Sequence, residues 1–319
     1  MREITCHCGS DPELIGIYTI ADNHNERNAA RADNTAINEH SGNQSSRPVI
    51  LLLNSGLLPN VGPFRLYVRL ARHFAQLGFD TFRFDLSGIG DSERRTDNKP
   101  RSEQQISDIK LTIDHLQKQY NANEFIVMGI CTGADNAHRA MLADQRIVGA
   151  IGIDGYFYKT SRYYLNFLFK DLLPRLLQWE TWRLKSLSVY KQLKIRFRHL
   201  FSVLGNVGGL TDSNGEDFKF STVPVSVPYR WEVPDKDQTE RDYREIIDRG
   251  SSMLCIFTAS WPYNYTEQLA DAFPDLPVGD NLQVHYLENS EHLFPLAQDR
   301  EELSDVVTEW LSERFGDHR

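Results

Sequence analysis

The sequence contains few cysteines and no long apolar run, and both absences restrict the class of protein that it can encode. Four cysteines among 319 residues are too few for a disulfide framework, so we expect a reducing compartment. No apolar stretch reaches the ~18–20 residues that a membrane-spanning helix needs. The first residues also lack the charged-then-apolar order of a signal peptide. We therefore expect a cytoplasmic protein without membrane contact.

The sequence also shows no complete set of metal ligands and no basic nucleic-acid-binding module. Cys6-His7-Cys8 is one candidate set of ligands, but no second pair follows at a suitable spacing. The net charge is -9, and no known nucleic-acid-binding module is recognisable, so we expect no nucleic acid as partner. The sequence predicts neither a metal nor a cofactor.

What the chain does contain is an alternation of strand-like and helix-like segments. Two short strands are expected within 1–21. Apolar strand runs at 49–54, 81–85, 125–128 and 147–153 then alternate with helical spacing at 66–77, 104–120 and 134–142. This rhythm predicts an α/β fold with a mostly parallel sheet covered on both faces by helices.

The alternation stops after residue 154 and resumes with segments 253–258, 265–273, 282–287 and 300–315. We therefore predict one core domain made of 1–154 and 251–319, with a mainly helical lid inserted at 155–250. Within it, 156–200 holds ten Lys or Arg against two acids, about +8, so the remainder carries about -17. Such a segment is a candidate contact for an anionic partner, although it also fits a plain solvated lid or a membrane-surface helix.

The most informative motif lies between the apolar strand run 125–128 and the helix predicted at 134–142. Residues 129–133 read Gly-Ile-Cys-Thr-Gly, a G-x-C-x-G pattern. In a strand–turn–helix context this pattern is typical of a nucleophile elbow, where small residues let the strand and the helix pass closely. The side chain of Cys131 would then project at a helix N-terminus, which favours a thiolate. The alternative is a buried cysteine that only fills a turn.

Several motifs in this order make the chain resemble the α/β-hydrolases, and within them the bacterial serine-aminopeptidase-like (S33-like) hydrolases. Asn54-Ser55-Gly56 follows the third strand, 85–92 matches a D-x-x-G-x-G-x-S loop, and the elbow follows the fifth strand. A cysteine in the elbow is the minority choice in this superfamily. The resemblance covers about 48–154 and 251–318 and implies an inserted lid after the sixth strand.

The resemblance also implies roles for individual residues. His292, just past the eighth strand, would be the catalytic base, with His115 and His138 as weaker candidates. The oxyanion hole would use the N–H of Thr132 and that of Ser55 or Leu57. Substrate contacts are expected from Asn54, Asp135 and Tyr156, although Asp135 equally fits a first-turn acid favoured by the helix dipole.

The acid that orients the histidine is harder to assign. This superfamily usually has an Asp after the seventh strand, but residues 259–265 contain no carboxylate. Asp154, at the end of the sixth strand, is the preferred acid and Glu267 is the alternative. A Cys-His pair without an acid is the third reading, since a thiol ionises more readily than a serine hydroxyl.

The sequence therefore favours an enzyme that forms an acyl-cysteine intermediate from an activated ester or thioester of a small acyl substrate. Such an enzyme passes the acyl group to water or to another nucleophile, as a thioesterase or an acyltransferase does. An acyl-carrier protein or a coenzyme A thioester could contact the basic lid. The alternatives are a carboxylic-ester hydrolase of small-molecule metabolism and a catalytically inactive binding module.

Overall fold

The computed structural model describes residues 1–22, 47–156, 158–174, 233–259 and 264–316. The chain divides into two compact units, Met1–Tyr163 with Val233–Arg319, and Tyr164–Glu232. Along the sequence, α5 (Ser161–Asn166) and the π-helix η2 (Phe167–Leu172) lie at the boundary between them. Most of the predicted basic lid lies outside the described residues. No helix in the described part of the chain is long and apolar enough to cross a membrane.

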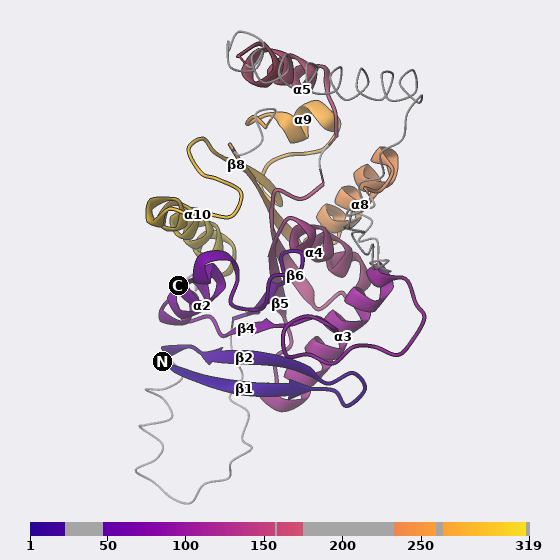
Figure 1. The fold of residues 1–319 in the computed structure, drawn as a ribbon, viewed down its shortest axis with the longest axis vertical. Coiled ribbons are helices and arrows are strands. Elements are labelled where there is room, and N and C mark those ends of the chain that lie inside the picture. Colours follow the sequence, from indigo (N-terminus) through magenta and orange to yellow (C-terminus); the bar gives the residue numbers. More distant parts are fainter. Residues whose placement is uncertain (23–46, 157, 175–232, 260–263, 317–319) are drawn as a thin grey trace, which may run out of the picture. The chain divides into compact units, whose positions relative to one another are not determined.

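The first unit is built on one eight-stranded sheet with the order β1-β2-β4-β3-β5-β6-β7-β8 (Figure 1). β1 pairs antiparallel with β2, and β2 pairs antiparallel with β4, whereas all other neighbours are parallel. The strands are β1 (Arg2–Cys8), β2 (Leu14–Ile20), β3 (Val49–Leu53), β4 (Thr81–Phe84), β5 (Phe125–Ile130), β6 (Ile147–Ile153), β7 (Ser252–Thr258) and β8 (Leu282–Leu287). The predicted mostly parallel sheet is confirmed.

The central strands form because both of their faces are apolar. Every residue of β3 and β5 is buried, and alternate side chains belong to two separate core clusters, one on each face of the sheet. Val49, Leu51 and Leu53 lie in one cluster, while Ile50 and Leu52 lie in the other. The sheet therefore has a complete core on each side, as a doubly covered sheet requires.

Helices cover both faces of this sheet (Figure 1). α2 (Leu66–Gln76), which follows the short 3₁₀ helix η1 (Pro63–Arg65), and α10 (Ala297–Phe315) border one core cluster. The other cluster is bordered by α3 (Arg101–Tyr120), α4 (Thr132–Ala143), α8 (Lys236–Asp248) and α9 (Gln268–Ala272). The predicted helix at 265–273 is shorter than expected. The Gln268 side chain accepts a hydrogen bond from the Tyr265 N–H at the point where the helix was predicted to begin.

The two units divide the chain differently from the predicted core and lid. The insertion was predicted at 155–250, whereas 155–163 and 233–250 lie in the first unit. Helix α8 is the main difference, because it buries Tyr243 and Ile246 in the same core cluster as α4. Its narrow apolar face, on an otherwise charged helix, gave little sign in the sequence that it packs on the sheet domain.

Candidate active site

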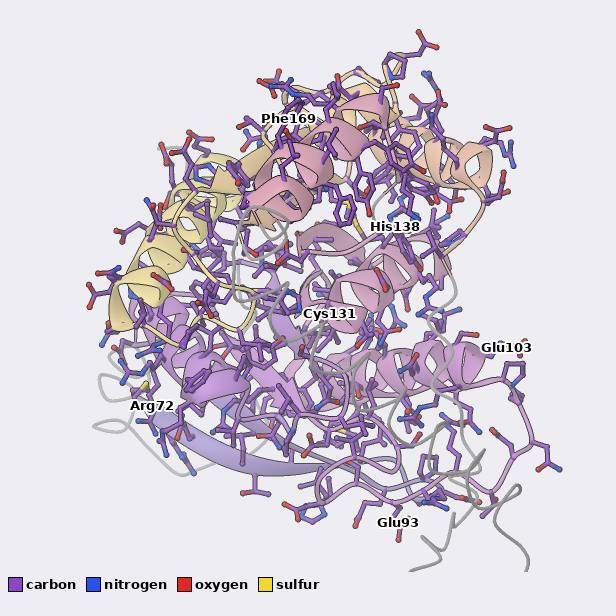
Figure 2. All side chains as sticks on the ribbon, turned by 45° about the horizontal axis from the view of Figure 1, so that its top comes forward. Arg72, Glu93, Glu103, Cys131, His138 and Phe169 are labelled. Atoms are coloured by element: carbon purple, nitrogen blue, oxygen red, sulfur yellow. The ribbon has the colours of Figure 1, made fainter. Side chains whose placement is uncertain are left out.

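Cys131 occupies a strained turn between β5 and α4. Its backbone has φ 56° and ψ -120°, a left-handed conformation that a residue with a side chain rarely adopts. The two glycines of the motif make the turn sterically feasible. A Cβ on Gly129 would lie 2.2 Å from the carbonyl carbon of Gly133, and a Cβ on Gly133 would lie 2.8 Å from the Asn54 oxygen. The elbow geometry predicted from the motif is present, and Cys131 lies at the start of α4 (Figure 2).

Hydrogen bonds to β6 and within α4 fix this turn. The Cys131 N–H donates to the Ile153 carbonyl at 2.8 Å, and the Cys131 carbonyl accepts from the N–H groups of Ala134 and Asp135. Thr132 is the first residue of α4, so its own N–H has no acceptor within the helix. That N–H is thus placed to donate to a negatively charged oxygen beside Cys131.

His292 and Asp154 come together beside this turn from two different strand ends. Asp154 directly follows β6 in a left-handed conformation, with φ 47°, and His292 lies in the connection between β8 and α10. The Nδ1 atom of His292 donates to Oδ2 of Asp154 at 2.7 Å. A second side-chain hydrogen bond joins His292 to Cys131, and with Nδ1 occupied it falls to Nε2. Cys131, His292 and Asp154 therefore form a continuous chain of contacts.

The environment of His292 favours its protonated form. Burial opposes the positive charge, but the hydrogen bonds and charges of Asp154 and Cys131 outweigh it and raise the pKa of His292 from 6.5 to about 9. An imidazolium is consequently present at neutral pH. The imidazole of His292 lies between a carboxylate and a thiol, so it is placed to act as an acid and a base in reactions at the sulfur.

The loop after β3 is tied to the elbow through Thr132. The hydroxyl of Thr132 accepts a hydrogen bond from the Gly56 N–H at 2.8 Å. Ser55 and Leu57, the two predicted partners in the oxyanion hole, flank that anchored residue, and the Ser55 carbonyl closes a turn with the Leu58 N–H at 3.0 Å. The anchored Gly56 therefore holds the backbone of its neighbours Ser55 and Leu57 next to the start of α4.

A family model described as serine aminopeptidase, S33, matches residues 60–209. The matched stretch contains Cys131 and Asp154 and ends before His292. No curated protein matches the sequence.

Solved structures resemble the chain over nearly its whole length. A protein of unknown function from Agrobacterium tumefaciens is 16% identical, with a TM-score of 0.51, and the alignment covers 98% of this chain and 96% of that one. An esterase from Pyrococcus furiosus is 14% identical, with a TM-score of 0.51 and coverages of 98% and 90%. An alpha/beta hydrolase from Penicillium sp. sh18 is 13% identical, with a TM-score of 0.52 and coverages of 98% and 98%. The fold is the α/β-hydrolase fold.

Within this α/β-hydrolase fold, the predicted substrate contact Asn54 has a structural task. Its amide nitrogen donates to the Leu58 carbonyl and to the Asp85 carboxylate, both at 2.9 Å, and its oxygen accepts from the Leu86 N–H at 2.8 Å. All of these partners lie in the loops after β3 and β4. The side chain of Asn54 therefore joins two loops instead of pointing its amide toward a substrate.

The contacts within the loop at 85–92 account for its glycine-rich motif. The Asp85 carboxylate accepts hydrogen bonds from the Asn60 N–H at 2.7 Å and from the Asn60 side chain at 2.6 Å. Gly90 has φ 53°, and a Cβ there would lie 2.2 Å from Oδ2 of Asp85, so the position requires glycine. Ser92 donates to the Asp85 carbonyl at 2.7 Å. The motif thus builds a rigid loop around a buried carboxylate.

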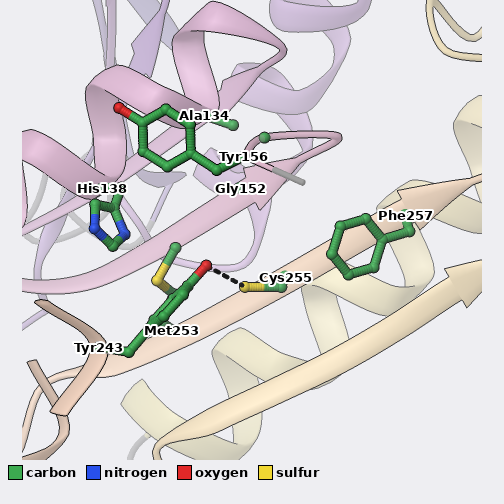
Figure 3. Close-up of a pocket in the computed structure, with 9 residues that line it drawn as sticks. Ala134, His138, Gly152, Tyr156, Tyr243, Met253, Cys255 and Phe257 are labelled. Atoms are coloured by element: carbon green, nitrogen blue, oxygen red, sulfur yellow. Dashed lines mark hydrogen bonds between the residues drawn. The ribbon is translucent and has the colours of Figure 1, made fainter. Parts of the chain in front are cut away.

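Tyr156 and Asp135 are both buried. Tyr156 lines a cavity of about 20 Å³ together with Ala134 and His138, and Cys131 is not among the described residues that line this cavity (Figure 3). Asp135 is 2% exposed on the first turn of α4. The substrate contacts of both side chains remain predictions.

Glu267, the alternative acid, faces elsewhere. It precedes α9, is about half exposed, and forms an ion pair with Arg162 at 3.0 Å. Because Asp154 already accepts from Nδ1 of His292, the structure brings Asp154 and not Glu267 to the imidazole.

Two polar residues at the site were not predicted from the sequence. Thr258 ends β7, and Asn264 follows it in the next loop; both donate hydrogen bonds to the Asp154 carboxylate. A polar residue that ends an otherwise apolar strand at the carboxyl edge of a parallel sheet was the available signal, since such edges carry the functional groups of α/β folds.

Proposed function

We propose that this protein is an acyl-transfer enzyme whose Cys131 forms an acyl-cysteine intermediate from an activated ester or thioester. The observation that carries the proposal is the contact chain from Cys131 through His292 to Asp154 at a strained strand-to-helix turn. An inactive binding module, the third possibility from the sequence, has no need of such a chain. The match to a hydrolase family model over 60–209 supports the same class of chemistry.

The proposed first half-reaction is the transfer of the acyl group to sulfur. The thiolate of Cys131 attacks the carbonyl carbon, and the carbonyl π electrons move to the oxygen. The N–H of Thr132 and an N–H of Ser55 or Leu57 donate to that oxyanion. The intermediate then collapses, and the leaving group departs with the proton that His292 supplies from Nε2. Asp154 stabilises the imidazolium before this transfer.

The second half-reaction releases the acyl group. His292, now neutral at Nε2, accepts a proton from water or from another nucleophile as that group attacks the thioester carbon. The second tetrahedral intermediate expels the Cys131 thiolate, and His292 retains the proton. The site thus returns to its starting form, and the identity of the attacking nucleophile decides between thioesterase and acyltransferase.

Sulfur favours thioester donors, because exchange of one thioester for another is nearly balanced in energy. The basic segment 156–200 supports an acyl-carrier protein or coenzyme A as the donor, since either is anionic. In the described part of this segment, Arg162 pairs with Glu267 and Lys159 lies 6.0 Å from the centre of the Tyr163 ring. The other cations lie outside the described side chains.

Ester hydrolysis is the second candidate function. The structural similarity to an esterase from Pyrococcus furiosus favours it, and the same three residues would serve it. Turnover of paired substrates separates the two candidates: octanoyl thioester and octanoyl p-nitrophenyl ester, each with wild type and Cys131→Ala. A thioester preference that Cys131→Ala removes supports the first candidate. Turnover of the oxygen ester alone, again lost in Cys131→Ala, supports the second.

A thiol-labelling experiment tests the proposal against a binding module. We expect iodoacetamide to modify Cys131 at pH 6 in wild type and to do so at least about tenfold more slowly in His292→Ala, because the imidazolium that attracts the thiolate is then missing. Cys255 is a built-in control, since burial raises the pKa of its thiol to about 12. Equal labelling of Cys131 in wild type and His292→Ala would contradict an activated thiolate.

A further inference from the structure

The Asp154 carboxylate is surrounded by donors from the end of β7. Oδ1 accepts from the Thr258 N–H at 2.9 Å and from the Asn264 amide at 3.3 Å, while Oδ2 accepts from the Thr258 hydroxyl at 2.6 Å. With the bond from His292, the carboxylate accepts four hydrogen bonds. Both oxygens are therefore engaged by β7 and its following loop, and only Oδ2 also reaches the imidazole.

These donors are themselves fixed. Thr258 is fully buried and Asn264 is 3% exposed, so water does not compete with Asp154 for their hydrogen bonds. The Asn264 amide also donates to the Thr258 carbonyl at 2.9 Å, which joins the two donors in one network. A carboxylate removed from water is costly unless hydrogen bonds replace its hydration, and this network supplies them.

The network also determines the direction in which Asp154 points. Thr258 contacts one carboxylate oxygen through its N–H and the other through its hydroxyl, which prevents rotation of the carboxylate about its last bond. The backbone of Asp154 is held in a left-handed conformation, and its N–H donates to the Ile256 carbonyl at 2.9 Å. Loss of the hydroxyl would leave Oδ2 with His292 alone, so that only the donors to Oδ1 would still resist rotation of the carboxylate.

We propose that Thr258 and Asn264 are positioning residues, which keep the Asp154 carboxylate turned toward His292. The thiol chemistry then depends on two side chains of β7 and its loop that touch neither the sulfur nor the imidazole in the described structure. The kinetic part of this inference rests on the proposed function, whereas the part that concerns the state of His292 does not.

The test measures the pKa of His292 by NMR titration of its ring protons in wild type, Thr258→Val, Thr258→Ser and Asn264→Ala. Among the described residues, the other titratable groups at this site are Cys131 on the imidazole and Tyr286, whose own pKa is raised by burial and by the charges of Glu288 and Asp154. We expect Thr258→Val to lower the pKa of His292 from about 9 toward its ordinary value of 6.5. Thr258→Ser keeps the hydroxyl and should retain the wild-type value.

Asn264→Ala provides an independent test in case Thr258→Val does not fold. It should lower the pKa of His292 by a smaller amount, because the bond from Asn264 to Oδ1 of Asp154 is longer. Thr239→Val is the matched control: this threonine is also fully buried and bonded through its hydroxyl, to Tyr158 at 2.6 Å, but on α8. An unchanged His292 titration in both Thr258→Val and Asn264→Ala would overturn the inference.

The kinetic readout is the rate of Cys131 acylation by octanoyl N-acetylcysteamine as a function of pH. Cys131 should be acylated at least about tenfold more slowly in Thr258→Val, as expected when a supporting group near a reacting centre is lost. Thr258→Ser should react at the wild-type rate. A lower rate at every pH with an unchanged profile would indicate only a damaged fold and would count against positioning. If wild type is not acylated at all, the proposed function fails, while the titration still decides the role of Thr258 and Asn264.

Discussion

Nδ1 of His292 lies 2.7 Å from Oδ2 of Asp154, although 138 residues separate them along the chain. The contact joins the end of β6 to the connection after β8, and β7 lies between these two strands in the sheet. It places the acid one strand earlier than the superfamily resemblance leads one to expect. The missing carboxylate after β7 is therefore compatible with a complete Cys–His–Asp arrangement.

The first prediction concerns that contact. Asp154→Asn should lower the pKa of His292 from about 9 toward its ordinary 6.5, because only Cys131 then opposes the effect of burial. NMR titration of the His292 ring measures it. Asp144→Asn, which removes a carboxylate that pairs with Arg146 instead, should leave the titration unchanged. A His292 pKa that stays near 9 in Asp154→Asn would contradict the contact.

The second prediction is the pH dependence of stability. The folded-state pKa of His292, about 9, lies above the unfolded value of 6.5, so the folded protein binds the proton more tightly. The stabilisation is fully present below about pH 6.5 and is lost as the pH rises through about 9. The difference in free energy of unfolding between wild type and His292→Asn should therefore shrink from pH 6.5 to 9.5.

His115 supplies the control for this measurement. Burial and Lys118 lower the pKa of His115, so its protonation contributes nothing that changes above pH 7. The difference between wild type and His115→Asn should be constant from pH 7 to 9.5 in urea titrations. A constant difference for His292→Asn as well would show that His292 does not bind its proton more tightly in the folded state.

The third prediction concerns the elbow. Gly129→Ala should destabilise the fold by at least about 2 kcal/mol, because the added Cβ meets backbone atoms of Gly133 that cannot move independently of α4. Gly279→Ala is the matched control, since a Cβ there meets no atom within 4 Å. Chemical denaturation of both variants measures the effect. Equal stability of the two would argue against the close passage of strand and helix.

The fourth prediction separates the hydroxyl of Thr132 from its N–H. Thr132→Val removes the acceptor that holds the Gly56 N–H and should slow Cys131 acylation about tenfold to a hundredfold, since the second oxyanion donor is then displaced. Thr132→Ser keeps the acceptor and should react as wild type does. A valine variant as fast as wild type would show that the loop after β3 is positioned without this bond.

Much of the fold was predictable because local pattern and tertiary structure agree in it. Fully apolar runs such as 49–53 and 125–130 can be stable only in a sheet covered on both faces. The elbow was predictable for a similar reason, because two glycines around Cys131 admit a conformation that other residues would block. The order of these segments then gave the superfamily resemblance.

The remaining features depend on contacts that leave little trace in the sequence. Asp154 could be named only as one of three readings, since its selection rests on a left-handed backbone and on donors more than a hundred residues away. Asn54 was predicted to contact substrate, and only the structure shows that its side chain joins the loops after β3 and β4. Helix α8 was placed in the insertion because the alternation of strands and helices stops after residue 154 and resumes only at 253, and burial of Tyr243 is visible only in three dimensions.

The most direct measurement of the central claim is the intact mass of the protein after incubation with short- and medium-chain acyl N-acetylcysteamine thioesters. Wild type, Cys131→Ala and Cys255→Ala are compared, and peptide mapping locates any modification. We predict a mass increase of one acyl group in wild type and in Cys255→Ala, located at Cys131, and none in Cys131→Ala. An adduct that persists in Cys131→Ala, or thioester turnover that survives this substitution, would contradict an acyl-Cys131 intermediate.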